Sequence, residues 1–333
     1  MNVGINGFGR IGRCVLKLLL NDDRFNVVGI NDLADIGDLA YLLKYDSVHG
    51  WYPKKVDHSE HELIIDGQPI PFFSERSPNA LPWGKLGADV VLEASGAFRD
   101  RAAAAGHLEA GAKRVIISAP GTNVDGTFVL GVNDDQFDAD KHHIVSMASC
   151  TTNCLAPVAK VLHQEFGIER LMITTIHAYT SSQSLMDQPT RKRRRGRAAA
   201  VSMVPTTTGA AKATALVLPE LAGKMDGMAI RVPIPDGSIT DIVATLEKST
   251  TAEAINAALN AAAESKPLRG ILRVSDEALV SRDIIGDPHS SIVDSESTSV
   301  LDGRMAKLLS WYDNEWGYAA RLKDFVALMH DRI

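Results

Sequence analysis

The chain has 333 residues, 45% of them hydrophobic and 23% charged, a composition that is ordinary for a globular protein and excludes a disordered or collagen-like one. Its 35 basic and 41 acidic residues leave a net charge of −6, so the molecule as a whole does not attract nucleic acid or an anionic membrane. At about 150 residues per domain, this length predicts two domains.

The cysteines and the hydrophobic runs bear on the cellular compartment of the protein. Cys14, Cys150 and Cys154 are too few for a disulfide framework, and no two of them form the C-x-x-C pair of a zinc site. The first residues lack the basic and apolar segments of a signal peptide, and no apolar run approaches the ~18 residues of a membrane span. We therefore expect a cytoplasmic protein without a metal site or a membrane segment.

The first 150 residues or so alternate β-branched runs with helical patterns, which is typical of βαβ units around a mostly parallel sheet. The expected strands are VGIN, NVVGIND, ADVVLEASG, KRVIISAP, TFVLGVN and HIVSMAS. Between residues 56 and 82 the sequence becomes rich in Pro, Gly and charge, which predicts an antiparallel hairpin beside the main sheet. The predicted fold class is α/β.

A glycine-rich turn follows the first expected strand. Gly7, Gly9 and Gly12 form G-x-G-x-x-G between that strand and a helix, and Asp32 ends the next strand 20 residues after Gly12. Such glycines let the backbone approach a pyrophosphate at the positive end of the helix. A carboxylate at the position of Asp32 accepts hydrogen bonds from a ribose and repels a 2′-phosphate, so we predict NAD rather than NADP. A turn that binds no ligand is the alternative for both features.

A second junction between a strand and a helix carries a cysteine. In ASCTTNCLAPVAKVLHQEFG the apolar residues have helical spacing, with Cys150 at the helix start and Gly167 at its end. The helix dipole and the free N–H groups of the first turn favour a thiolate, so Cys150 should be nucleophilic. Cys154 lies one turn further along, where a cysteine is usually a small core residue. We expect a domain boundary near Cys150.

The second half has longer alternating runs, typical of a sheet with one face covered by helices, and it ends in an amphipathic helix. Among ten histidines, only His177 ends an apolar strand, MITTIHAYT, just before a polar loop. Imidazole beside a thiolate forms a nucleophile and base couple, which makes His177 the candidate partner of Cys150. A packing role for His177 is the alternative.

Longer stretches of the chain extend these motifs. In order along nearly the whole chain they are VGINGFGRIGR, LKYDSVHG, ASCTTNCLAP, TTIHAYT, RAAAVSMVPTTTGAAKA, RVPIP and WYDNEWGY. In sequence and order they resemble the phosphorylating glyceraldehyde-3-phosphate dehydrogenases. The resemblance implies a Rossmann NAD-binding domain over residues 1–149 and an α+β catalytic domain with a mixed or antiparallel sheet over 150–315. It also implies that a helix over 316–333 packs back on the first domain and that the protein is a homotetramer.

The resemblance further implies roles for individual residues. Cys150 would be the nucleophile, forming a hemithioacetal and then a thioester, and His177 the general base. The residues implied to hold NAD, with Asn314 at the nicotinamide carboxamide, are Gly7, Phe8, Gly9, Arg10, Ile11, Gly12, Asp32, Arg76, Ser118 and Asn314. Those implied to hold inorganic phosphate are Ser149, Thr151, Thr208 and Gly209. Those implied to hold the substrate's own phosphate are Thr180 and Arg231, with Arg195 between the two anions.

Two departures from the family's usual sequence bear on these roles. Ser181, Ser182 and Gln183 follow HAYT where many relatives have NDQ, which alters a polar contact near the substrate phosphate. Gln188 stands where NAD-specific relatives often have Leu, and this leaves partial use of NADP open, although Pro189 and Asp32 still point to NAD.

The function implied is the NAD-dependent conversion of glyceraldehyde 3-phosphate and inorganic phosphate to 1,3-bisphosphoglycerate and NADH. Erythrose-4-phosphate dehydrogenase and aspartate-semialdehyde dehydrogenase are enzyme alternatives, and the intact PTTTGAAKA and ASCTTNCLAP stretches argue against them. The run RKRRRGR at 191–197 has six basic residues in seven and would suggest RNA or an acidic partner if considered alone. In the family this stretch belongs to a loop at the cofactor site and subunit contacts, so we do not expect nucleic-acid binding.

Overall fold

The computed structural model describes residues 1–332, which form two compact units. The first unit comprises Met1–Phe128, Gln136–Ala148 and the chain from Ala319 on; the second comprises Val129–Asp135 and Ser149–Tyr318. The sequence-based division had placed residues 129–135 in the first domain, whereas in the structure they belong to the second unit. The predicted fold class, α/β with a second unit built on a mixed sheet, is confirmed.

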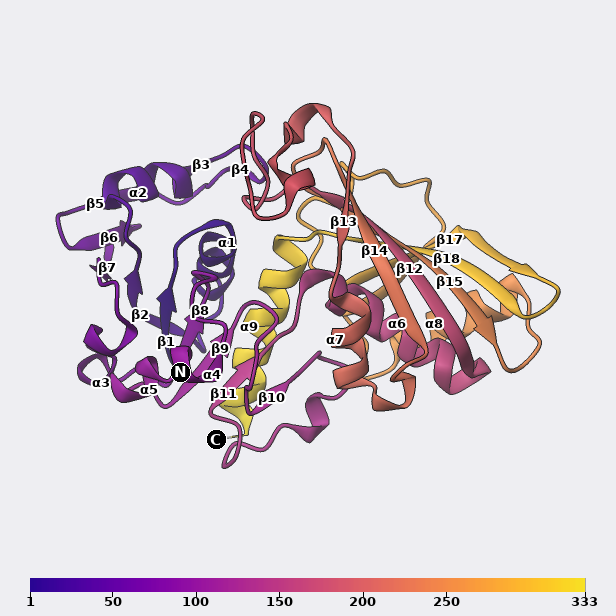
Figure 1. The fold of residues 1–333 in the computed structure, drawn as a ribbon. Coiled ribbons are helices and arrows are strands. Elements are labelled where there is room, and N and C mark those ends of the chain that lie inside the picture. Colours follow the sequence, from indigo (N-terminus) through magenta and orange to yellow (C-terminus); the bar gives the residue numbers. More distant parts are fainter. Residues whose placement is uncertain (333) are drawn as a thin grey trace. The chain divides into compact units, whose positions relative to one another are not determined.

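The first unit is built on a sheet that is parallel at its centre and antiparallel at one edge (Figure 1). In spatial order its strands are β10 (Gly126–Thr127), β11 (Ile144–Ser146), β9 (Arg114–Ile117), β8 (Val90–Glu93), β1 (Asn2–Asn6), β2 (Asn26–Asn31), β7 (Gln68–Phe73), β6 (Glu62–Ile65) and β5 (Val56–His58). All neighbours from β10 to β7 are parallel, whereas β7, β6 and β5 pair antiparallel. The predicted hairpin excursion is therefore confirmed. The central strands are apolar because helices cover such sheets on both faces.

The helices of the first unit are short except for the first, the second and the last. They are α1 (Arg10–Leu19), α2 (Ile36–Lys44), α3 (Trp83–Leu86), α4 (Arg101–Ala104), α5 (Gly106–Glu109) and, from Ala319 on, α9 (Trp316–Asp331). A small hairpin of β3 (Tyr45–Asp46) and β4 (Gly50–Trp51) follows α2. Within the first unit, the Phe325 ring of α9 stacks on Phe128 at 5.5 Å and meets the edge of Phe137 at 5.4 Å. This aromatic cluster packs α9 against the rest of the first unit.

One expected strand is wrong. Of TFVLGVN, only Thr127 lies in a strand, and the following residues turn instead. Gly131 has φ +76, and a Cβ there would meet Pro267 O at 2.5 Å, so the backbone folds in a way that a strand does not allow. The apolar residues of this stretch are nevertheless buried, Val129 completely. Burial of a turn produced the same apolar pattern as a strand.

The second unit is built on a mixed sheet (Figure 1). In spatial order its strands are β13 (Val204–Thr207), β14 (Met225–Val232), β12 (Ile168–Ala178), β15 (Ser238–Leu246), β18 (Met305–Tyr312), β17 (Ser291–Leu301) and β16 (Leu272–Ser275). The helices α6 (Cys150–Phe166), α7 (Ala210–Val217) and α8 (Ala252–Glu264) pack on one face of it. One covered face agrees with the sequence expectation for this half of the chain.

Three helices, α2, α6 and α8, begin at capping side chains. Asp35 accepts from two backbone N–H groups at the start of α2, and Ser149 and Thr251 each accept from one at the starts of α6 and α8. α6 ends at Gly167, whose φ of +70 suits glycine, so both predicted ends of this helix are confirmed. No helix within residues 1–332 has the length and apolar character needed to cross a bilayer.

The aromatic cluster gives a test of how the last helix is held. Phe325→Ala should lower the free energy of unfolding by about 3–5 kcal/mol, because it removes a fully buried ring and leaves a cavity between Phe128 and Phe137. Urea unfolding followed by circular dichroism measures the loss. Phe325→Leu, which keeps most of the volume, should lose clearly less; equal losses would mean that the rings do not hold the helix.

Candidate active site and dinucleotide pocket

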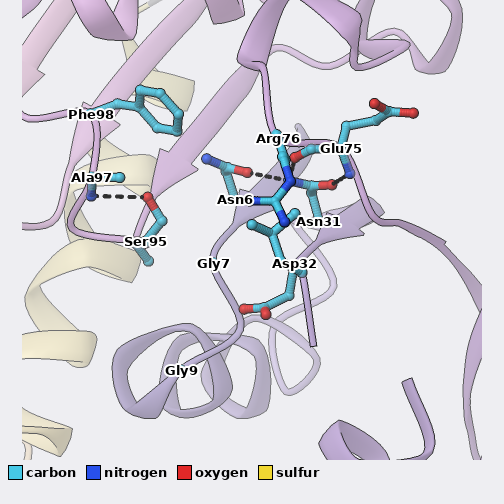
Figure 2. A pocket seen from close by; sticks show the side chains of 12 residues that line it. Asn6, Gly7, Gly9, Asn31, Asp32, Glu75, Arg76, Ser95, Ala97 and Phe98 are labelled. Atoms are coloured by element: carbon cyan, nitrogen blue, oxygen red, sulfur yellow. Dashed lines mark hydrogen bonds between the residues drawn. The ribbon is translucent and has the colours of Figure 1, made fainter. Parts of the chain in front are cut away.

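A pocket of about 410 Å³ opens in the first unit where the parallel strands end (Figure 2). It is lined by Asn6, Gly7, Gly9, Asn31, Asp32, Leu33, Glu75, Arg76, Ala94, Ser95, Ala97 and Phe98. Asn6 and Asn31 are the last residues of β1 and β2, and Ser95 follows β8. The carboxyl edge of a parallel sheet is the usual binding site of this fold type.

The glycines of the first turn are required by close packing. Gly7 has φ +97, and a Cβ there would lie 2.3 Å from the Ser95 backbone nitrogen. A Cβ on Gly12 would lie 2.1 Å from Gly7 O, so α1 can approach the turn only because both residues are glycines. The turn therefore delivers the N-terminus of α1, which starts after Gly9, to the pocket. A helix N-terminus in that place suits a pyrophosphate.

Asp32 lies in the pocket and also holds the glycine-rich turn. One carboxylate oxygen accepts from the Phe8 N–H at 2.7 Å and the other from the Ala34 N–H at 3.0 Å. A carboxylate still accepts further hydrogen bonds through its remaining lone pairs, which fits a ribose diol. Its negative charge does not fit a 2′-phosphate. The residues present thus suit NAD.

The structure brings some of the predicted cofactor residues together and leaves others outside the pocket wall. Gly7, Gly9, Asp32 and Arg76 line it. The predicted residues that do not line it are Phe8, which is buried, Arg10, which forms an ion pair with Asp46 at 2.8 Å, Ile11 and Gly12 in α1, Ser118 after β9, and Asn314 in the second unit. Sequence reasoning missed Asn6, Asn31, Glu75, Ser95 and Phe98. Their position at or after strand ends was the available signal.

The second unit contains the predicted nucleophile and base. Cys150 is the first residue of α6, and His177 is next to last in β12. Cys150 Sγ lies 3.5 Å from His177 Nε2, within the range of a hydrogen bond to sulfur. Ala148, which precedes this helix by two residues, has φ +55, a left-handed conformation that is costly for alanine and gives the sharp turn from strand to helix. The pair expected from the sequence is therefore assembled.

The surroundings of this pair shift the pKa of both Cys150 and His177. Burial raises the pKa of the Cys150 thiol, while the Arg231 guanidinium and the Thr151 hydroxyl and N–H oppose that rise. Burial, reinforced by the charge of Arg231, lowers the pKa of His177 to about 3. Each shift favours the neutral form of its own group. Attraction between thiolate and imidazolium across 3.5 Å acts in the other direction, which makes transfer of the proton within the pair the favourable way to form a thiolate.

The other ring nitrogen of His177 has partners for both of its protonation states. Nδ1 lies 2.7 Å from Ala178 O, an acceptor, and 2.8 Å from Arg231 Nη1, a donor. The ring can therefore present a free Nε2 lone pair to a thiol, or a proton on Nε2, without losing a partner at Nδ1. This arrangement suits a residue that receives and returns a proton.

Tyr312 is a residue of this site that sequence reasoning missed. Its buried hydroxyl bonds Thr151 Oγ1 at 2.9 Å and Thr175 Oγ1 at 2.8 Å, and its ring meets the His177 ring edge-on at 5.9 Å. It thereby ties the first turn of α6 to the end of β12. Thr151, which was expected to receive phosphate, is buried, and its hydroxyl bonds Tyr312.

Polar groups for anions gather in the loop after β12. The Ser182 hydroxyl joins Thr180 at 2.9 Å and Arg195 at 3.0 Å, and Arg195 also donates to Thr206. Arg195 contributes to lowering the pKa of His177, after burial and Arg231, so its charge acts at the catalytic pair. Ser182, one of the residues that follow HAYT, thus links Thr180 to Arg195.

The remaining predicted residues lie at helix starts or behind the imidazole. Ser149 caps α6, and its hydroxyl accepts from the Thr152 N–H. Thr208 and Gly209 precede α7, and among the described residues they form no hydrogen bond with the catalytic pair. Asn314 accepts from the Ser238 hydroxyl at 2.6 Å, and that hydroxyl accepts from the Ala178 N–H, so Asn314 is linked to the residue after His177.

Cys154 is buried, as expected for a core residue. Its thiol donates to Ser310, and burial raises its pKa to about 11. None of the three cysteines, all of which lie within the described residues, forms a disulfide.

Comparison with known proteins decides the family. A family model described as the glyceraldehyde 3-phosphate dehydrogenase NAD binding domain matches residues 1–101, and one described as the C-terminal domain of the same enzyme matches residues 149–314. This chain belongs to the glyceraldehyde-3-phosphate dehydrogenase family. Its cofactor is NAD, in agreement with the pocket around Asp32.

Relatives in the family are similar over their whole length. The glyceraldehyde-3-phosphate dehydrogenase of Geobacillus stearothermophilus is 56% identical over 98% of this chain and 97% of its own. That of Mycolicibacterium smegmatis is 55% identical over 99% and 98%, and that of Streptomyces coelicolor 50% over 100% and 99%. The family predicted from the sequence motifs is thus confirmed.

The charge of Asp32 gives a test of cofactor choice. Asp32→Asn should narrow the ratio of kcat/KM for NAD over NADP by about tenfold or more, because repulsion of the 2′-phosphate is removed. Asp35→Asn, which changes the net charge equally at the cap of α2 outside the pocket, should leave the ratio unchanged. An unaltered ratio in Asp32→Asn would show that its charge does not select the cofactor.

The proton exchange between Cys150 and His177 gives a second test. His177→Asn should slow turnover by ~10²–10⁴-fold, the usual contribution of a positioned base. Labelling of Cys150 by iodoacetamide should also shift to higher pH, because burial raises the thiol pKa and no imidazole then receives the proton. Cys150→Ser supplies the blank for labelling of other cysteines. Superimposable curves in parent and variant would mean that His177 has no part in activating the thiol.

Proposed function

We propose that this protein oxidises glyceraldehyde 3-phosphate with NAD and inorganic phosphate, giving 1,3-bisphosphoglycerate and NADH. The observation that carries the proposal is the 3.5 Å contact between Cys150 Sγ at the start of α6 and His177 Nε2. A thiol and an imidazole in this geometry form a nucleophile and base couple suited to acyl chemistry at a carbonyl carbon. Membership of the family supplies the substrate class.

The first step is attack of the cysteine on the aldehyde. His177 takes the thiol proton through Nε2, and Sγ forms a bond to the carbonyl carbon, giving a hemithioacetal. The first-turn N–H groups of α6 and the Arg231 guanidinium are positive groups near Sγ that stabilise the developing oxyanion. The proton is then returned to that oxygen.

Oxidation follows at the same carbon. Bound NAD would accept the hydride that leaves this carbon. His177 takes the hydroxyl proton as the C=O bond re-forms, and the product is a thioester on Cys150. Asn314, held by the Ser238 hydroxyl, is the residue we assign to orienting the nicotinamide carboxamide.

Inorganic phosphate then attacks the thioester carbon and breaks the C–S bond, which yields the acyl phosphate and regenerates the thiolate. We assign reception of this phosphate to Ser149, Thr208 and Gly209, with Thr151 acting through its backbone because its hydroxyl bonds Tyr312. Thr180 and Arg231 would hold the phosphate of the substrate itself, and Arg195 lies in the same polar cluster as Thr180. Two anions with three hydroxyls and two arginines form a chemically matched set.

The basic run at 191–197 does not favour the RNA-binding alternative. Lys192 donates to Thr207, Arg195 donates to Ser182 and Thr206, and Arg197 forms an ion pair with Asp187. Half of the six basic side chains thus have partners within their own unit, and their contacts shape the loop beside the catalytic pair. This agrees with the loop role expected from the family.

We further propose a cytoplasmic homotetramer. A reducing compartment suits a nucleophilic Cys150 that must remain a free thiol. The uncovered face of the second sheet exposes Met172 by 58%, Met228 by 42% and Met305 by 48%, more apolar surface than a solitary sheet face usually presents to water. Light scattering coupled to size-exclusion chromatography measures the mass; a monomer at micromolar concentration would overturn the tetramer and leave the chemistry untouched.

The phosphate requirement tests the proposed function. NADH production from glyceraldehyde 3-phosphate should depend on phosphate or arsenate, because His177 carries the hydroxyl proton once the thioester has formed and cannot then act as a base on water. Thr208→Ala should lower kcat/KM for phosphate by about three- to tenfold, the value of one hydroxyl contact, whereas Thr208→Ser should retain it. Full sustained turnover without phosphate or arsenate would identify a hydrolytic aldehyde dehydrogenase instead.

A further inference from the structure

A buried carboxylate lies directly behind the wall of the dinucleotide pocket. Glu93 ends β8, is 1% exposed and does not line the pocket. One of its oxygens accepts from the Ser95 N–H at 2.9 Å and the Ser95 hydroxyl at 2.5 Å, and the other accepts from the Asn6 amide at 2.5 Å. Ser95 and Asn6 both line the pocket. Glu93 thus holds two pocket residues on neighbouring strands at once.

His107 of α5 completes this arrangement from the other side. It is fully buried, with Nε2 3.1 Å from the Glu93 carboxylate oxygen and Nδ1 3.0 Å from the Trp83 indole nitrogen. An indole N–H can only donate, so Nδ1 must accept and the ring proton must be on Nε2, directed at Glu93. Trp83 therefore selects the tautomer in which His107 donates to the carboxylate.

Further hydrogen bonds extend this network from Asn6 along the pocket wall (Figure 2). The Asn6 side-chain oxygen accepts from the Asn31 amide at 2.7 Å. Asn31 in turn donates to the Glu75 backbone oxygen at 2.9 Å and accepts from its N–H at 2.8 Å. The network therefore runs from a core tryptophan to Glu75, the residue before Arg76, across the ends of three adjacent strands.

We propose that Glu93 and His107 are positioning residues for NAD: the imidazole orients the carboxylate, and the carboxylate fixes Asn6 and the turn at Ser95 as a cofactor-binding surface. Neither residue reaches the pocket itself, so both act through the side chains that do. The proposal rests on the NAD pocket and on no step of the aldehyde chemistry. Its rival is that the pair only satisfies buried polar groups of the core.

Two substitutions at one position separate these roles. In His107→Asn the side chain keeps an acceptor near Nδ1 for Trp83 but withdraws the donor from Glu93. In His107→Gln the amide reaches the position of Nε2 and can still donate. NAD titrated by calorimetry, without aldehyde, should bind His107→Asn about tenfold more weakly than the parent, and His107→Gln within about threefold of it. In steady state, KM for NAD should rise in His107→Asn while kcat at saturating NAD changes little.

Melting temperatures of both variants, compared with their affinities for NAD, distinguish the positioning role from a purely structural one. Parent-like NAD binding by His107→Asn would overturn the proposal, and so would equal weakening in the two variants that follows their loss of stability. If His107→Asn does not fold, Glu93→Gln is the variant to test. The Glu93 carboxylate accepts from four donors, and the amide of Gln would direct hydrogens at some of them. An unchanged Kd for NAD in that variant would overturn the proposal. A parent that binds NAD but does not oxidise glyceraldehyde 3-phosphate would contradict the proposed function alone.

Discussion

The contact between Cys150 and His177 depends on the register of three strands in the second sheet. Ile176 of β12 pairs with Ile239 of β15, and Ser238 of β15 pairs with Tyr312 of β18. This register brings Tyr312 level with the end of β12, where its hydroxyl reaches across to the first turn of α6. A slip of one residue would turn Tyr312 to the opposite face of the sheet and remove the link. The geometry of the nucleophile is thus set by β-pairing far away in sequence.

The environment of Cys150, more than the thiol itself, makes it the nucleophile. Cys154 lies on the same helix and is fully buried; its thiol donates to Ser310, and burial raises its pKa to about 11. Burial also raises the pKa of the partly buried Cys150, yet Cys150 has Arg231 nearby and an imidazole that can receive its proton. The low dielectric that penalises a lone charge also strengthens the attraction within a charged pair. A buried thiolate is therefore favoured only at Cys150, where His177 can accept the proton.

Features encoded by short stretches of sequence were predictable, and those made by distant pairing were not. The turn at Gly7, the carboxylate of Asp32 and the helix start at Cys150 each follow from a local strand–turn–helix pattern. Tyr312 and Glu93 gave no comparable signal, because their partners lie elsewhere in the chain and become neighbours only when the sheets form. TFVLGVN shows the opposite failure, since hydrophobic periodicity reports burial and cannot by itself tell a buried turn from a buried strand.

Two carboxylates of the protein fix the loops that follow β1 and β8. Asp32 accepts from the Phe8 N–H in one loop, and Glu93 accepts from the Ser95 N–H in the other. Loops ordered by the protein itself need not be ordered by the cofactor, so less of the binding energy is lost to conformational entropy. Both carboxylates would repel a pyrophosphate if they faced it. Engaging backbone N–H groups points them elsewhere, which leaves the start of α1 as the positive end toward the phosphates and Asp32 as the acceptor for the ribose.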